Sequence, residues 1–364
     1  MSTLGGWGGW GGWGGWGGWG GWSSWNGWSG ASSQSSAADP LVSRMLIQSQ
    51  EGTMTRPDRK VGLGVLLDNT LPAKLDDSAA MDKWDPFIRY NLCLFEALSG
   101  LSLKTHEEKS ACLFAGDAAL VRIHAVRDIR IIERQLLAVD SWGKSHREKR
   151  SDEIVVQMAP QKPFWNTILN LQPHRHARTN ELIELTVALA AICSIRVKHA
   201  LNVPRPAMFS GRLQPIVPTP EHGSLPSGHA TEAFAVVELM KRLLNKTAAT
   251  DTRVEQLERL ATRIADNRVI AGVHYPMDSA AGWTLGFAVA AYMQRLACKT
   301  AINGVYFDAE VFQPVAADSA AADFVLAATP APMSDDSDVS LKMEAKSSSA
   351  LLEKLWSEAK KEWL

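Results

Sequence analysis

Hydrophobic residues recur at helical spacing over most of the middle of the chain. Phe87, Tyr90 and Leu94 share one helical face, and a second apolar run extends from Ala118 to Leu137. Alternating, strand-like patterns are nearly absent. We therefore expect an all-α helical bundle from about residue 80 to about residue 300. Its four most regular helices are predicted over Leu182–Lys198, Ala230–Leu244, Val254–Arg268 and Ser279–Leu296.

Both ends of the chain differ from this middle part. From Trp7 to Trp28 a tryptophan occupies every third position, mostly between Gly-Gly pairs, a period that matches neither helix nor strand. We expect a low-complexity tail, either without an essential role or used for self-association or surface anchoring. Five segments follow from these changes in composition: the tail and a Ser/Ala linker (1–40), a connecting segment (41–80), the helical domain (81–305), an Ala/Asp/Ser/Pro-rich linker (306–347) and an amphipathic C-terminal helix (348–364).

That C-terminal helix carries Leu352, Leu355 and Trp356 on one stripe, opposite charged residues. We expect it to pack on the domain or on a partner, with membrane contact as the alternative. A homo-oligomer and contact of the termini with a membrane surface both remain open at this point.

Charge and hydropathy exclude some classes of protein. The net charge of −1 argues against a nucleic-acid partner, whose phosphates would require a basic excess. A membrane-spanning helix needs about 18–20 apolar residues. The best candidate stretches, Leu182–Ile195 and Ser279–Met293, are too short or are interrupted by charge. With no signal-peptide pattern visible, we expect a cytoplasmic protein without a transmembrane span.

Two motifs in the second half of the chain suit an anion. Lys198 lies near the end of a predicted helix and Pro204 stops that helix, so that Arg205 can turn toward the same space. In Pro226-Ser227-Gly228-His229, Ser227 is a natural N-cap and Gly228 allows a ligand to approach the backbone. The amides at this helix start would then face an anion, with His229 beside it. Alone, each motif fits an ordinary structural role better.

The third motif runs from Arg268 to Asp278. His274 falls in a bend, and Pro276 suits the first turn of the next helix. The Asp278 carboxylate can then reach back to one ring nitrogen of His274, which raises the basicity of the other nitrogen. Such a pair is either a nucleophile with its orienting partner or a structural contact.

In this order, Lys-x6-Arg-Pro, Pro-Ser-Gly-His and Arg-x5-His-x3-Asp resemble the signature of one superfamily. It joins the type 2 phosphatidic acid phosphatases, the bacterial class A acid phosphatases and the vanadium-dependent haloperoxidases. The resemblance covers roughly residues 182–297. Asn267 stands where many members have Ser, which leaves one supporting contact in doubt.

For a phosphatase, the resemblance implies that His274 attacks phosphorus and becomes a phosphohistidine, while Asp278 orients it. His229 would protonate the leaving alcohol and then activate water. No metal is needed, and no Cys/His cluster has metal-ligand spacing. The phosphate oxygens would be held by Lys198, Arg205, Ser227, Gly228 and Arg268.

Three functions stay open on these grounds. The first, which the compact spacing between motifs favours, is a metal-independent phosphomonoesterase acting on a small phosphorylated substrate. The second is a haloperoxidase with vanadate as cofactor, which the resemblance places on His274 with His229 as acid–base. The third is a scaffold or self-association role carried by the Trp-rich tail.

Overall fold

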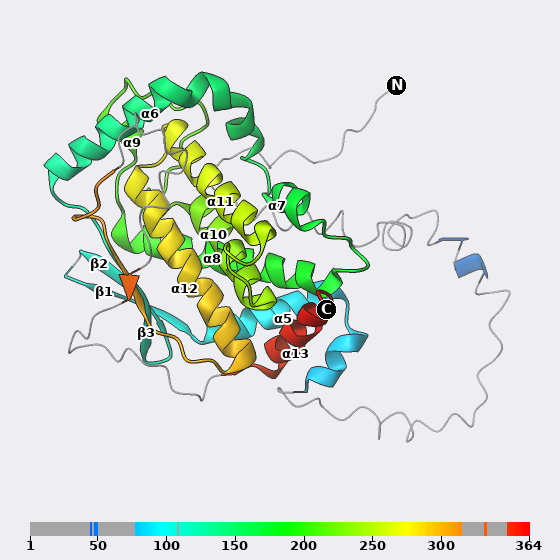
Figure 1. Cartoon of the computed structure of the whole chain (residues 1–364). Helices are drawn as coiled ribbons and strands as arrows, with labels where there is room; N and C mark the ends of the chain where they lie inside the picture. Colours follow the sequence, from blue (N-terminus) through cyan, green and yellow to red (C-terminus); the bar gives the residue numbers. More distant parts are fainter. Residues whose placement is uncertain (1–43, 46, 50–76, 108, 315–330, 333–347) are drawn as a thin grey trace, which may run out of the picture.

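The computed structural model describes residues 44–45, 47–49, 77–107, 109–314, 331–332 and 348–364 (Figure 1). The Gly/Trp tail and most of segments 41–80 and 306–347 lie outside these residues, so the predictions made for them stay predictions. The helices are the 3-10 helix η1 (Ser78–Lys83), α5 (Pro86–Ser99), α6 (Ile129–Val156), α7 (Lys162–Leu169), α8 (Ala177–Leu201), α9 (Pro206–Phe209), α10 (Gly228–Leu244), α11 (Thr252–Ile270), α12 (Pro276–Cys298) and α13 (Ala350–Lys361). The strands are β1 (Leu101–His106), β2 (Ser110–Ala115), β3 (Ala118–His124), β4 (Val305–Asp308) and β5 (Ala331–Pro332).

Four long helices, α8, α10, α11 and α12, make up the centre of the molecule. All four correspond to helices predicted from the apolar spacing, with boundaries that differ by a few residues. Helix α10 lies in the middle and packs against the other three, while α6 crosses one end of the group (Figure 1). None of the helices in the described part of the chain is both long and apolar enough to cross a membrane.

Two glycines let α12 approach α10 closely. A Cβ added to Gly286 would lie 2.6 Å from the Thr231 carbonyl oxygen, and one added to Gly282 would lie 2.8 Å from that of Ser227. The backbone amide of Ser227 also donates a 2.8 Å hydrogen bond to the carbonyl of Asp278. The start of α10 is therefore fixed directly against the first turn of α12.

The fold is mainly helical but not all-α, so that part of the prediction is wrong. The sheet has the order β1-β2-β3-β4-β5, and β3 pairs in parallel with β4, far away in sequence. The apolar run beginning at Ala118 forms β3 before α6 begins at Ile129. Strand β2 is buried at all six positions and therefore lacks the alternation by which a half-exposed strand is recognised. Strand β4 also extends the sheet past the domain end predicted at residue 305.

The C-terminal helix packs back on the domain, as one of its two interpretations predicted. Helix α13 contacts α8 and α12, and Leu352, Leu355 and Trp356 of the predicted stripe are buried there. In Figure 1 the helix lies next to α5, with the C-terminus at its end.

Candidate active site

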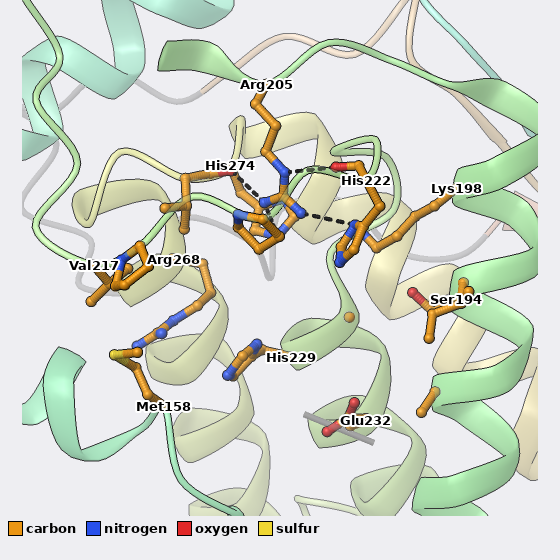
Figure 2. A pocket seen from close by; sticks show the side chains of 16 residues that line it. Met158, Ser194, Lys198, Arg205, Val217, His222, His229, Glu232, Arg268 and His274 are labelled. Carbon is orange, nitrogen blue, oxygen red and sulfur yellow. Dashed lines mark hydrogen bonds between the residues drawn. The ribbon is translucent and has the colours of Figure 1, made fainter. Parts of the chain in front are cut away.

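The structure brings the three motifs together in one pocket (Figure 2). Its walls come from α8, α10 and α11, from the segments that precede α9, α10 and α12, and from Met158 just after α6. Ser227 and Asp278 are fully buried and do not line the pocket. The other six predicted site residues all line it: Lys198, Arg205, Gly228, His229, Arg268 and His274.

The hydrogen bonds of His274 define which of its nitrogens carries the proton. Its Nδ1 lies 2.9 Å from Oδ2 of Asp278, and that oxygen also accepts the amide of Tyr275 at 2.9 Å. A carboxylate accepts, so Nδ1 donates and Nε2 keeps its lone pair. The guanidinium of Arg205, which can only donate, lies 3.2 Å from Nε2. Burial and the nearby Arg205 lower the pKa of His274 well below its usual value, which leaves a neutral imidazole whose Nε2 lone pair accepts from Arg205 at the pocket.

The cations of the pocket are held by carbonyl oxygens. Lys198 Nζ donates to the carbonyls of Gly223 (3.2 Å) and Ser224 (2.8 Å), and Arg205 Nη1 donates to Val273 (2.8 Å). Burial lowers the pKa of Arg205 to about 10, so this guanidinium stays charged at neutral pH, whereas burial and the charge of Arg205 lower the pKa of Lys198 well below its usual value. Burying charge without a counter-ion is costly, and the arrangement therefore favours an anion.

Helix α10 begins at the pocket with its amides available. Ser227 is its N-cap, and the Ser227 hydroxyl accepts the amide of Ala230 at 3.4 Å. A Cβ on Gly228 would have as its nearest neighbour only Ser194 Oγ, at 3.8 Å. The backbone at Gly228 is thus open toward the pocket, as expected for an anion site at a helix start.

Gln157, at the end of α6, contacts both His229 and Arg268. Its carbonyl oxygen lies 3.1 Å from Nε2 of His229, and its side-chain oxygen accepts Arg268 Nη2 at 3.2 Å. That oxygen also accepts a hydrogen bond from the side-chain Nδ2 of Asn267 at 2.9 Å. Asn267 therefore has a defined contact: it donates to the same Gln157 oxygen that accepts from Arg268, and so helps to position Gln157.

Burial and the charge of Arg268 lower the pKa of His229 to about 3. Burial also lowers the pKa of Arg268 to about 10, and its Nε has no hydrogen-bond partner within the described residues. The Arg268 guanidinium therefore keeps its Nε donor for a ligand.

Sequence reasoning missed three polar residues of the site. Gln157 carries no motif and precedes its partners by more than a hundred residues. Ser194 and Glu232 line the pocket and are 1% and 5% exposed. A helical signal was present for both, since Ser194 lies four residues before Lys198 and Glu232 four residues after Gly228.

Comparison with known families confirms the resemblance. Residues 182–299 match the PAP2 superfamily. The match contains every predicted site residue, from Lys198 to Asp278. No curated protein matches the chain. The PAP2 match over this segment supports phosphatase-type or related hydrolysis, and the substrate has to be inferred from the site itself.

Proposed function

We propose that this protein is a phosphomonoesterase that needs no metal ion and works through a phosphohistidine on His274. The observation that carries the proposal is the orientation of that ring. Asp278 holds its Nδ1 proton, and Nε2 faces a pocket with buried cations. A phosphoryl group is electrophilic and a phosphomonoester is anionic, so this pocket provides both an attacking nitrogen and charge stabilisation.

The residues of the site fall into two groups, one that would bind the phosphate and one that would transfer protons. Lys198, Arg205 and Arg268, together with the start of α10 at Ser227 and Gly228, would hold the phosphate oxygens. We assign the proton transfers at the leaving oxygen and at the attacking water to His229, which lines the pocket.

The test is a paired assay on one preparation of the full chain. Hydrolysis of p-nitrophenyl phosphate is measured in the presence of a chelator, and dye bromination is measured with orthovanadate and peroxide. We expect hydrolysis that vanadate inhibits, because vanadate resembles the phosphoryl transition state. Vanadate-dependent bromination with little hydrolysis would overturn the proposal in favour of a haloperoxidase.

His274→Ala tests the intermediate itself. We expect this variant to lose hydrolysis and to lose the protein-bound phosphate that is trapped by rapid quenching, stable in alkali and labile in acid. His199→Ala is the matched control, because His199 is exposed on α8 and lies outside the pocket. Substantial hydrolysis by His274→Ala would exclude the phosphohistidine.

A further inference from the structure

Two buried polar side chains in the pocket have no partner among the residues that the structure describes. Ser194 on α8 is 1% exposed, and within the described chain its Oγ makes no hydrogen bond. Glu232 on α10 is 5% exposed, and across the same described residues its carboxyl has neither a hydrogen bond nor an ion pair. Both side chains line the pocket. Buried polar groups without hydrogen bonds are costly, and a ligand that supplied the missing bonds would remove this cost.

The two side chains converge beside the first turn of α10. A Cβ on Gly228 would lie 3.8 Å from Ser194 Oγ, so this hydroxyl lies next to the start of that helix. Glu232 comes four residues after Gly228 on the same helix, and a long side chain on a helix points back toward the preceding turn. In Figure 2 the Ser194 hydroxyl is directed into the pocket. A single ligand group can therefore meet both side chains next to a phosphate bound at Gly228.

The leaving group of a phosphomonoester would extend toward this part of the pocket. In-line attack by His274 puts the leaving oxygen on the opposite side of phosphorus. Figure 2 shows Glu232 and His229 at the other end of the pocket from His274. Ala191 and Ile195 of α8 also line the pocket, and both are apolar. The alcohol part of the substrate would thus meet an apolar wall that contains two hydrogen-bonding groups.

A hydroxyl group fits these two partners better than an ammonium group. A hydroxyl can donate to one side chain and accept from the other, so it satisfies both at once. An ammonium would enter a pocket that already holds the guanidinium groups of Arg205 and Arg268. Burial raises the pKa of Glu232 to about 8, against the effect of Lys198, so at neutral pH its carboxyl offers little negative charge to a cation.

We propose that Ser194 and Glu232 form a subsite for a hydroxyl group on the alcohol part of the substrate. The protein then prefers the monophosphate esters of small diols and polyols to those of simple alkyl alcohols. This inference rests on the proposed phosphatase function and names the substrate class for it. The two side chains select the ester by hydrogen bonds and take no part in a covalent step.

Three esters that differ in one terminal group test the subsite: 2-hydroxyethyl phosphate, propyl phosphate and 2-aminoethyl phosphate. The first two have nearly the same size, and only one of them carries the hydroxyl. We expect the wild-type kcat/KM to be about 10–100-fold higher for 2-hydroxyethyl phosphate than for propyl phosphate, because the propyl group leaves the buried polar groups unpaired. It should also be higher than for 2-aminoethyl phosphate.

Variants of the two side chains then assign the preference. Glu232→Leu should bring the ratio of 2-hydroxyethyl to propyl phosphate to within about threefold of one, because an apolar side chain of similar size replaces the carboxyl. Glu232→Gln should keep most of the preference, because an amide also accepts and donates. Ser194→Ala removes one hydroxyl from the pocket wall and should lower the ratio about threefold to tenfold, which gives a result even if Glu232→Leu does not fold.

Glu238→Leu is the matched control. It makes the same substitution on the same helix at a residue that is also 5% exposed, but Glu238 is paired with Lys241 and Arg242 and does not line the pocket. It should leave the ratio of the two esters unchanged, whatever it does to stability.

A wild type that hydrolyses p-nitrophenyl phosphate but does not prefer 2-hydroxyethyl to propyl phosphate would overturn the subsite and leave the phosphatase function intact. Variants of Ser194 and Glu232 that all keep the wild-type ratio would overturn it as well. A preference for 2-aminoethyl phosphate that Glu232→Gln abolishes would replace the hydroxyl with an ammonium. A wild type that hydrolyses none of the four esters would instead overturn the phosphatase function itself.

Discussion

Individual side chains in the pocket are positioned so that their positive charge is not cancelled. Lys198, Arg205 and Arg268 donate to carbonyl oxygens, and within the described residues none of them forms an ion pair with a carboxylate. A carbonyl orients a cation without neutralising it, so the charge stays available to a phosphate. A bound anion would then gain charge-assisted hydrogen bonds, which are stronger than neutral ones.

Arg268→Ala tests this at one residue. Arg268 is 2% exposed, and its Nε is a free donor, so we expect its loss to weaken inhibition by inorganic phosphate by about 10–100-fold, the equivalent of about 1.5–3 kcal/mol. Arg259→Ala removes an exposed arginine from the same helix and should change the inhibition constant less than twofold. Equal inhibition constants for the two variants would show that Arg268 does not contact the anion.

Contacts between residues close in sequence could be predicted, whereas contacts between distant residues could not. The His274–Asp278 bond could be predicted because a proline at the start of a helix fixes the geometry over four residues. Gln157 could not be predicted, since it meets Asn267 and Arg268 only after α6 folds against α11. Glu232 had a readable helical position, but its burial, which raises its pKa to about 8, is defined only by the folded structure.

At the scale of the helices, the contact between α10 and α12 determines how the second and third sequence motifs lie relative to each other. Helix α12 carries Asp278 in its first turn, and α10 begins at Gly228, so any separation of the two helices moves Asp278 and its partner His274 away from the start of α10. Gly282 and Gly286 permit the close approach, and their place in a long Ala-rich run gave no sign of which helix they would meet.

Gly286→Ala should disturb this contact. The new Cβ would lie 2.6 Å from one carbonyl oxygen of α10 and 2.8 Å from the amide of Ala235, so one helix has to shift. We expect a loss of about 1–3 kcal/mol in the free energy of unfolding, measured by chemical denaturation, together with a lower kcat. Gly211→Ala, where a Cβ meets nothing within 4 Å, is the control and should leave both quantities unchanged. Full stability in Gly286→Ala would show that the helices are not in tight contact.

Local sequence patterns did not predict the β-sheet. Strands β2 and β3 form a hairpin around Gly116, which has a positive φ of 60°, and this turn was the one local sign of a strand pair. Both strands are short apolar runs, which periodicity does not distinguish from buried helix. The pairing of Val121 with Val305 joins distant parts of the chain and has no local signature at all.

For the molecule as a whole, α8 connects the C-terminus to the pocket. Glu362, just after α13, accepts the amides of Arg178 (2.7 Å) and Thr179 (2.8 Å) in the first turn of α8. The N-cap of α8, His176, makes no capping bond with its own side chain, so Glu362 takes that place from the other end of the chain. Lys198 lies near the opposite end of the same helix, roughly 28 Å from Thr179 at 1.5 Å per residue.

Glu362→Ala should therefore lower the stability of the protein without changing its catalytic activity. Removing a cap that also carries a charge matched to the helix dipole should cost about 1–2 kcal/mol of unfolding free energy. At 25 °C the folded fraction should keep its kcat/KM on p-nitrophenyl phosphate, because the cap is remote from the pocket. Lys361→Ala, an exposed neighbour in the last turn of α13, is the control for both measurements. A drop in kcat/KM without a loss of stability would mean that the C-terminal helix acts on the site through α8 rather than only holding the domain together.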